Sequence, residues 1–152
     1  MTSSARLVFL ATITALGAAS AQEARAGGTS TIVLEVSTFR NLKGFLGCQL
    51  YATPESFPDK WQSQVNLRKH VPVTGPTTSC TFSDLAPGTY AAAVIHDENG
   101  NGTLDKNFLG IPTEAYGISN NHTHALSRPT WNESKFYVSA DATVTSKISL
   151  RY

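Results

Sequence analysis

A succession of short segments with alternating side chains is the feature that most constrains the fold of this chain. Residues 32–37 place Ile32, Leu34 and Val36 on one face of an extended strand, and residues 144–152 repeat the pattern. A period of two is typical of a strand with one buried face. Comparable segments lie at 45–52, 78–82 and 89–96. Together with the lack of a long helical pattern, they predict an all-β fold, a single antiparallel, immunoglobulin-like β-sandwich of about seven strands.

Two further segments are assigned from their prolines. Residues 65–73 have the composition of a strand, but Pro72 cannot donate a ladder hydrogen bond and confines that strand to an edge. Thr53-Pro54 supplies the N-cap and first position of a short helical turn. Phe57 and Trp61, which follow on this turn, are expected to cover an open end of the core.

The N-terminus has the organisation of a secretory signal peptide. Arg6 precedes an apolar run from Leu7 to Ala19, and Ala19-Ser20-Ala21 forms a small-x-small cleavage site. Cleavage after Ala26 is the alternative. The run is shorter than the roughly 20 residues that span a bilayer, and no later stretch is long and apolar enough. We therefore expect an exported protein, periplasmic or secreted, with no transmembrane segment in the mature chain.

The remaining chain is expected to form one domain with a nearly neutral charge. The predicted division is a signal peptide at 1–21, a flexible linker at 22–30 and a β-sandwich domain at 31–152. The whole sequence has 12 basic and 11 acidic side chains, and loss of Arg6 with the signal peptide balances them. A balanced charge gives no support for a nucleic acid or an anionic membrane as partner. The expected partner is an unknown envelope protein or a small ligand.

The two cysteines, Cys48 and Cys80, each belong to the apolar face of an alternating segment. Both side chains should therefore point into the core, and an exported chain can oxidise them. The sequence predicts a disulfide across the core, which would stabilise the fold by roughly 3–4 kcal/mol in the chain-entropy model. The alternative is two separate buried thiols that act as small hydrophobic residues.

Residues 97–105 follow the predicted strand 89–96 and have oxygen-bearing side chains at alternate positions. Asp97, Asn99, Asn101 and Gly102 match positions of the D-x-[DN]-x-[DN]-G template of calcium loops. Ca²⁺ takes about six to eight oxygen ligands from a chain that wraps around it. The candidate ligands are the side chains of Asp97, Asn99, Asn101 and Asp105 and the carbonyl of Thr103.

The calcium template is incomplete. Phe108 stands where a calcium loop of the EF-hand type has a bidentate Glu, so another residue or water must complete the shell. Glu114 is the candidate for this last ligand. The alternative is a plain β-hairpin turn, because Asn-Gly occurs twice and is the favoured type I′ pair. A turn accounts for the asparagines and glycines but not for Asp97 and Asp105 at the two ends.

Periodicity disappears between residues 106 and 133. The apolar side chains of this segment argue against disorder, so we expect one long ordered loop that folds back over an end of the sandwich, beside Asp97. Within it, His122 and His124, together with His96 or His70, could contribute imidazole ligands to a zinc or copper site. No Cys or carboxylate lies at ligand spacing from them, and two solvated loop histidines remain the alternative.

Three stretches resemble a known family. They are Leu85-Ala86-Pro87-Gly88-Thr89-Tyr90, His96-Asp97-Glu98-Asn99-Gly100-Asn101-Gly102, and the segment from Leu109 to Asn121. Together they resemble the bacterial family catalogued as domain of unknown function 2141, over about Ile32 to Tyr152. The resemblance implies an exported bacterial protein and no established activity. The Pro-Gly-x-Tyr turn is also similar to that of prealbumin-like sandwiches, such as carboxypeptidase regulatory-like domains, which implies a fold and not a function.

No serine or cysteine stands in a recognisable nucleophile motif. The sequence therefore predicts an exported binding or structural module with a calcium-stabilised loop and no catalytic activity. The alternative is a small-ligand-binding or enzymatic domain whose pocket lies under the 106–133 segment. The residues that would line that pocket are Glu114, Tyr116, His122 and His124.

Overall fold

The computed structural model describes residues 29–58, 67–122 and 127–152. The predicted signal peptide at 1–21 lies outside the described residues, as do Trp61, Val65 and His124. Among the described residues, no helix has the length and apolar character needed to cross a membrane.

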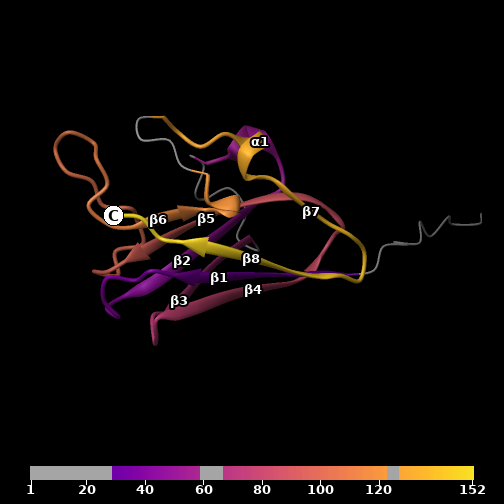
Figure 1. The fold of residues 1–152 in the computed structure, drawn as a ribbon, viewed down its shortest axis with the longest axis horizontal. Helices are drawn as coiled ribbons and strands as arrows, with labels where there is room; N and C mark the ends of the chain where they lie inside the picture. The colour runs from indigo at the N-terminus through magenta and orange to yellow at the C-terminus, as the bar shows by residue number, and fades with distance from the viewer. Residues whose placement is uncertain (1–28, 59–66, 123–126) are drawn as a thin grey trace, which may run out of the picture.

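Strands dominate the described chain and form two sheets (Figure 1), which confirms the predicted all-β fold. The strands are β1 (Ser30–Ser37), β2 (Phe45–Tyr51), β3 (Arg68–Pro72), β4 (Thr77–Leu85), β5 (Gly88–Asp97), β6 (Tyr116–Ile118), β7 (Phe136–Val138) and β8 (Thr143–Ser149). The short helical segments named in the described residues are η1 (Pro54–Ser56), η3 (Ser119–Asn121) and α1 (Trp131–Ser134).

The smaller sheet has the order β4-β1-β8 and is mixed. β1 is antiparallel to β4 but parallel to β8, with Leu34 opposite Ser146. This parallel pair corrects the expectation of a wholly antiparallel fold. It arises because β7 pairs with β5 in the other sheet, so the chain crosses between sheets before it enters β8 beside β1.

The larger sheet has the order β3-β2-β5-β6, and β7 also pairs with β5. β3 contains Pro72 and lies at an edge, as the sequence predicted. The described residues contain eight strands, one more than the seven expected, and two of them, β6 and β7, are only three residues long. A strand of that length is too short to show an alternating pattern.

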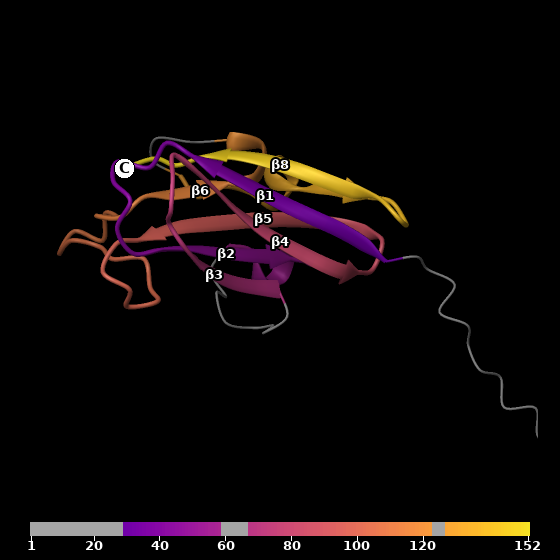
Figure 2. The same cartoon turned by 90° about the horizontal axis from the view of Figure 1, so that it is seen from below.

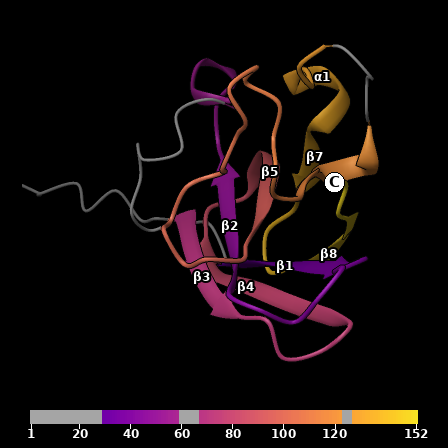
Figure 3. The same ribbon diagram turned by 90° about the vertical axis from the view of Figure 1, so that its left-hand side faces the viewer.

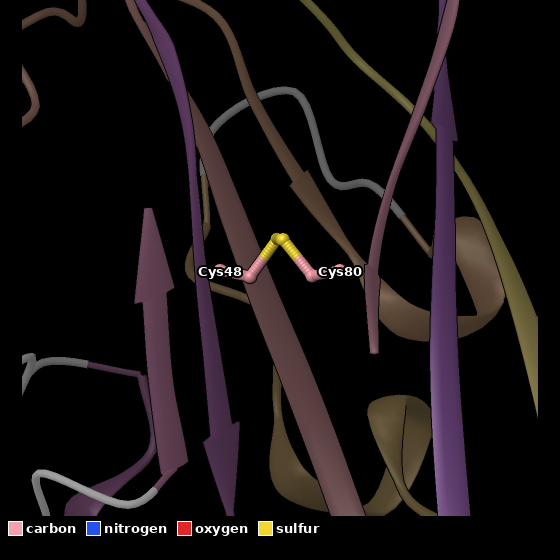
Figure 4. Close-up of a disulfide and its surroundings, with 2 residues drawn as sticks. All are labelled: Cys48 and Cys80. Carbon is pink, nitrogen blue, oxygen red and sulfur yellow. A yellow bond between two sulfur atoms is a disulfide. The ribbon is translucent and has the colours of Figure 1, made fainter. Parts of the chain in front are cut away.

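A disulfide joins the two sheets through the core. Cys48 in β2 is bonded to Cys80 in β4, with 6.5 Å between their Cα atoms (Figure 4), which confirms the predicted pairing. Both cysteines are fully buried within a cluster that draws on both sheets. Members of this cluster include Ile32, Leu34, Leu46, Leu50, Phe82, Val94 and Ile148.

A second, smaller cluster lies on the other face of the larger sheet. Tyr51 and Ala93 point away from the disulfide and pack with Phe57 and Trp131. The rings of Tyr51 and Phe57 are 5.2 Å apart in an edge-to-face arrangement. Figure 3 shows α1 on the side of the β2–β5 layer opposite β1 and β4. Phe57 thus covers an outer sheet face, not the open end of the core that the sequence suggested.

The segment at 106–133 is not one loop folded over the molecule. Its first part projects from the end where the C-terminus lies (Figures 1 and 2), with Phe108 exposed. Its later described parts form β6, η3 and α1, which pack against the larger sheet and β8. The expectation of a single packed cover is therefore wrong for residues 107–111, because their apolar side chains face solvent.

Candidate functional site

The candidate site begins at Asp97, the last residue of β5. Pairing of Asp97 with Phe45 in β2 fixes its position at the end of the ladder, and its side chain is fully buried. One carboxylate oxygen, Oδ1, accepts hydrogen bonds from the backbone N–H groups of Gly100 (2.8 Å) and Asn101 (3.0 Å). The other, Oδ2, accepts one from Gly102 N–H (2.7 Å). The loop therefore wraps around the buried carboxylate of Asp97.

Two glycines allow this wrap. Gly100 and Gly102 have φ values of 76° and 78°, a region that a residue with a Cβ adopts only with strain. A third glycine, Gly44, supports the site from the β1–β2 loop with φ of 70°, and a Cβ there would lie 2.0 Å from the Asp97 carbonyl oxygen. The sequence template pointed to Gly102, whereas the role of Gly44 depends on a contact between distant segments.

Asp105 closes the loop through two amides. Its Oδ2 accepts a hydrogen bond from Asn99 Nδ2 (2.6 Å), and its Oδ1 accepts one from Asn101 Nδ2 (2.8 Å). Asn99 Oδ1 accepts from Asn101 N–H at 3.0 Å, and Asn101 Oδ1 accepts from Thr103 N–H at 2.9 Å. The structure thus links four of the predicted ligands and Thr103 in one short network.

Glu114 lies at the base of this loop. It is almost fully buried, and its Oε1 accepts a hydrogen bond from Glu98 N–H (2.8 Å) while its Oε2 accepts one from Asp105 N–H (3.1 Å). The carboxylate thereby holds together the first and last parts of the loop. Sequence reasoning suggested that Glu114 approaches the loop, but it did not foresee these bonds to the backbone.

The acidic side chains do not form a compact metal cluster. Within the described residues, no three His, Cys, Asp or Glu side chains gather in a way that could hold a metal ion. His122 directly follows η3, so β6 and η3 separate it from Glu114 along the chain. His124 lies outside the described residues. Any cation at Asp97 would therefore depend on amide, carbonyl or water oxygens in addition to the carboxylates.

Glu98 links the loop to the β1–β2 connection. Its Oε1 lies 2.6 Å from Arg40 Nε, and its Oε2 accepts a hydrogen bond from Asn41 Nδ2 at 3.1 Å. Burial opposes ionisation of Glu98, but the hydrogen bonds from Arg40 and Asn41 and the charge of Arg40 outweigh it. The pKa of Glu98 consequently lies below its ordinary value. The hydrogen bond to Glu98 also raises the pKa of Arg40.

His96 is a hydrogen-bonded core histidine. It is fully buried, and its Nε2 lies 2.8 Å from the carbonyl oxygen of Lys43. A carbonyl only accepts, so Nε2 carries a proton. Its Nδ1 lies 3.0 Å from the hydroxyl of Tyr152, and this hydroxyl also accepts a bond from Arg40 N–H. The bonds fix His96 in the fold and attach the C-terminal residue to the loop end.

Comparison with known proteins places most of the chain in one family model. The model is described as an uncharacterized protein conserved in bacteria (DUF2141), and it matches residues 34–146. This range includes the disulfide, the Asp97 loop and Glu114. No curated protein and no solved structure matches the chain.

Proposed function

We propose that this chain, which belongs to the bacterial family DUF2141, is an exported binding or structural module without catalytic activity. Its frame is a β-sandwich of the immunoglobulin-like or prealbumin-like kind, closed by the Cys48–Cys80 disulfide. The loop from Asp97 to Asp105 binds a calcium ion that stabilises the end of the domain at which β5 ends.

The observation that supports a cation is the wrap of the loop around Asp97. Three backbone N–H groups donate to this carboxylate, which orients the loop around it. The amides of Asn99 and Asn101 meet at a second carboxylate, Asp105. Four oxygen-bearing side chains therefore gather within nine residues, and the first three stand at the first, third and fifth positions of the calcium template.

Binding requires the two amides to turn. At present Asn99 and Asn101 direct their Nδ2 donors toward Asp105. Rotation of each amide would present its oxygen instead, and a divalent cation between these oxygens and Asp105 would replace the amide hydrogens. The Thr103 carbonyl, water and Glu114 are the remaining candidate ligands. Use of Glu114 would require it to release at least one of its two backbone hydrogen bonds.

The site has few charged ligands and lacks the bidentate Glu of a complete calcium loop, so calcium binding should be weak. We expect a dissociation constant of roughly 10⁻⁴–10⁻³ M, as in extracellular calcium modules. At millimolar calcium the free energy of unfolding would then rise by only about 0.4–1.4 kcal/mol. A chelator should lower the melting temperature modestly and leave the protein folded.

Titration calorimetry and thermal melts in calcium and in chelator test this proposal. Asp105→Asn is the sharpest variant because it removes one charge and keeps the size of the side chain, whereas loss of Asp97 would also disturb three backbone bonds. We expect Asp105→Asn to melt like the parent in chelator and to lose the stabilisation by calcium. Glu114→Gln should weaken the response. The proposal is wrong if the parent shows no heat of binding and melts identically with calcium and with chelator.

A further inference from the structure

Exposed apolar side chains gather at the same end of the molecule as the Asp97 loop. The loop between β5 and β6 ends in a short turn that we call the apolar tip, residues 107–112. Its side chains Phe108, Leu109 and Ile111 are 96%, 67% and 56% exposed. The tip stands away from both sheets (Figures 1 and 2). Leu42, Phe45 and Tyr152 are also exposed, and all three belong to segments that reach this end.

The tip is held in shape by its own backbone and by Asn107. Asn107 Oδ1 accepts hydrogen bonds from the N–H groups of Leu109 and Ile111, both at 3.0 Å. Gly110 N–H donates to the Asn107 carbonyl at 2.9 Å, and Asn107 N–H donates to the Ile111 carbonyl at 2.8 Å. Four backbone donors of the tip are thus satisfied without water. The same bonds fix Phe108 and Leu109 in their outward position.

The charges around the tip are unevenly exposed. Asp97 and Glu114 are buried and bonded to backbone N–H groups, and Glu98 is paired with Arg40. The exposed basic side chains at this end are those of Lys43, Lys106 and Arg151, where Lys106 bridges to Pro112 at the base of the tip and Arg151 bridges to Tyr116. The partly exposed Asp105, which accepts hydrogen bonds from the amides of Asn99 and Asn101, adds one negative charge. The three exposed basic side chains outnumber it, so this end offers solvent more positive than negative charge, although the whole chain is nearly neutral.

We propose that the apolar tip inserts into the interfacial region of an anionic lipid bilayer. A bilayer interface takes up apolar and aromatic side chains and attracts the Lys and Arg residues that flank them. Entry of a backbone into an apolar environment is costly when its donors lose water without replacement, and the N–H groups of Asn107, Leu109, Gly110 and Ile111 are already bonded within the loop. The combination of a projecting apolar turn, satisfied donors and surrounding basic side chains fits a lipid surface.

A protein groove fits these observations less well. A standard protein interface buries about 800 Å² on each partner with a continuous apolar centre. Here Lys106 directly precedes the tip, and Arg40, which is paired with Glu98, also reaches the Thr113 carbonyl just after it. The tip projects from the molecule (Figures 1 and 2). The proposal does not rest on calcium binding. The test is therefore performed in chelator, so that failure of one proposal leaves the other standing.

The first measurement places a reporter on the tip. Phe108→Trp adds one indole at the most exposed apolar position, and subtraction of the parent spectrum removes the signals of Trp61 and Trp131. We expect the added fluorescence to shift to shorter wavelength with vesicles of phosphatidylcholine and phosphatidylglycerol. Brominated acyl chains should quench it. An indole that stays fully water-exposed with these vesicles would overturn the proposal.

The second measurement compares variants by co-sedimentation with the same vesicles. Phe108→Ser with Leu109→Ser should lower the partition coefficient by roughly tenfold or more. Tyr137→Ser is the matched control, because Tyr137 is 67% exposed but lies in β7, which pairs with the opposite end of β5. It should bind vesicles like the parent, and higher salt should weaken the binding of both. Equal loss in both variants, no loss in the tip variant, or tip-dependent capture of a protein without vesicle binding would each refute insertion.

Discussion

Two consecutive loops follow β5, residues 97–105 and the apolar tip. Each is held by one side-chain oxygen that accepts backbone N–H groups, but the first exposes polar side chains and the second exposes apolar ones. In the first, the carboxylate of Asp97 accepts three backbone N–H groups and is itself buried. In the second, the amide oxygen of Asn107 accepts two N–H groups and the apolar side chains face solvent. A side-chain acceptor can therefore fix a loop regardless of which side chains it exposes.

The two loops differ in what happens to the backbone N–H donors when the side-chain acceptor is removed. The carboxylate of Asp97 is buried away from water, so its removal would leave the three N–H donors without a substitute acceptor. Asn107 is neutral and exposed, so water can replace its amide oxygen. The loop from Asp97 to Asp105 should therefore unfold only together with the whole domain, whereas the apolar tip should open by local unfolding.

The largest effect is expected from Asp97→Ala, measured by denaturant unfolding in chelator. Three N–H groups at the end of β5 would lose a charged acceptor, and we expect the free energy of unfolding to fall by about 3–5 kcal/mol. Asp105→Ala is the control, because the hydrogen bonds at its carboxylate come from exposed amide side chains and its loss should cost less than about 1 kcal/mol. Similar losses in the two variants would show that Asp97 is no more structural than its partner.

A smaller and local effect is expected from Asn107→Ala. Loss of its amide oxygen should destabilise the tip by about 0.5–1 kcal/mol, which would speed hydrogen exchange at the Leu109 and Ile111 amides by roughly two- to sixfold. The melting temperature should stay unchanged because the tip lies outside the core. Asn107→Asp retains an acceptor and should retain the slow exchange. A drop in global stability in Asn107→Ala would contradict the contrast between the two loops.

The sequence was sufficient wherever a short-range pattern decides the structure. Alternation of apolar and polar side chains located the long strands. The position of Cys48 and Cys80 on the apolar faces of their strands predicted the disulfide between them. The spacing from Asp97 to Asp105 predicted residues that the structure joins in one network. These features depend on neighbours along the chain.

The rest depends on contacts between distant segments. Arg40 meets Glu98 across 58 positions, and His96 meets Tyr152 across 56, so no local spacing marks either pair. The parallel pairing of β1 with β8 is likewise set by the crossover between the sheets. The prediction that the tip packs against the sandwich was wrong because apolar residues are usually buried. Here the hydrogen bonds to Asn107 hold Phe108 and Leu109 in an exposed position.

The smallest effect is expected from Glu98, another carboxylate of this end, which is bonded to the side chains of Arg40 and Asn41. Its folded-state pKa lies below the ordinary value of 4.5. The ionised side chain therefore stabilises the fold above that pH, and the contribution is lost as the pH falls through the lower folded-state pKa. Because the pair with Arg40 is partly exposed, it should contribute at most about 0.5 kcal/mol to the free energy of unfolding. The difference in unfolding free energy between parent and Glu98→Gln should be largest at neutral pH and shrink toward zero in acid. In Arg40→Ala the strongest bond to Glu98 is gone while burial remains, so an NMR titration should find its pKa raised relative to the parent. An unchanged pKa in that variant would mean that Asn41 alone keeps Glu98 ionised, and the link between the loop and Arg40 would then contribute little to stability.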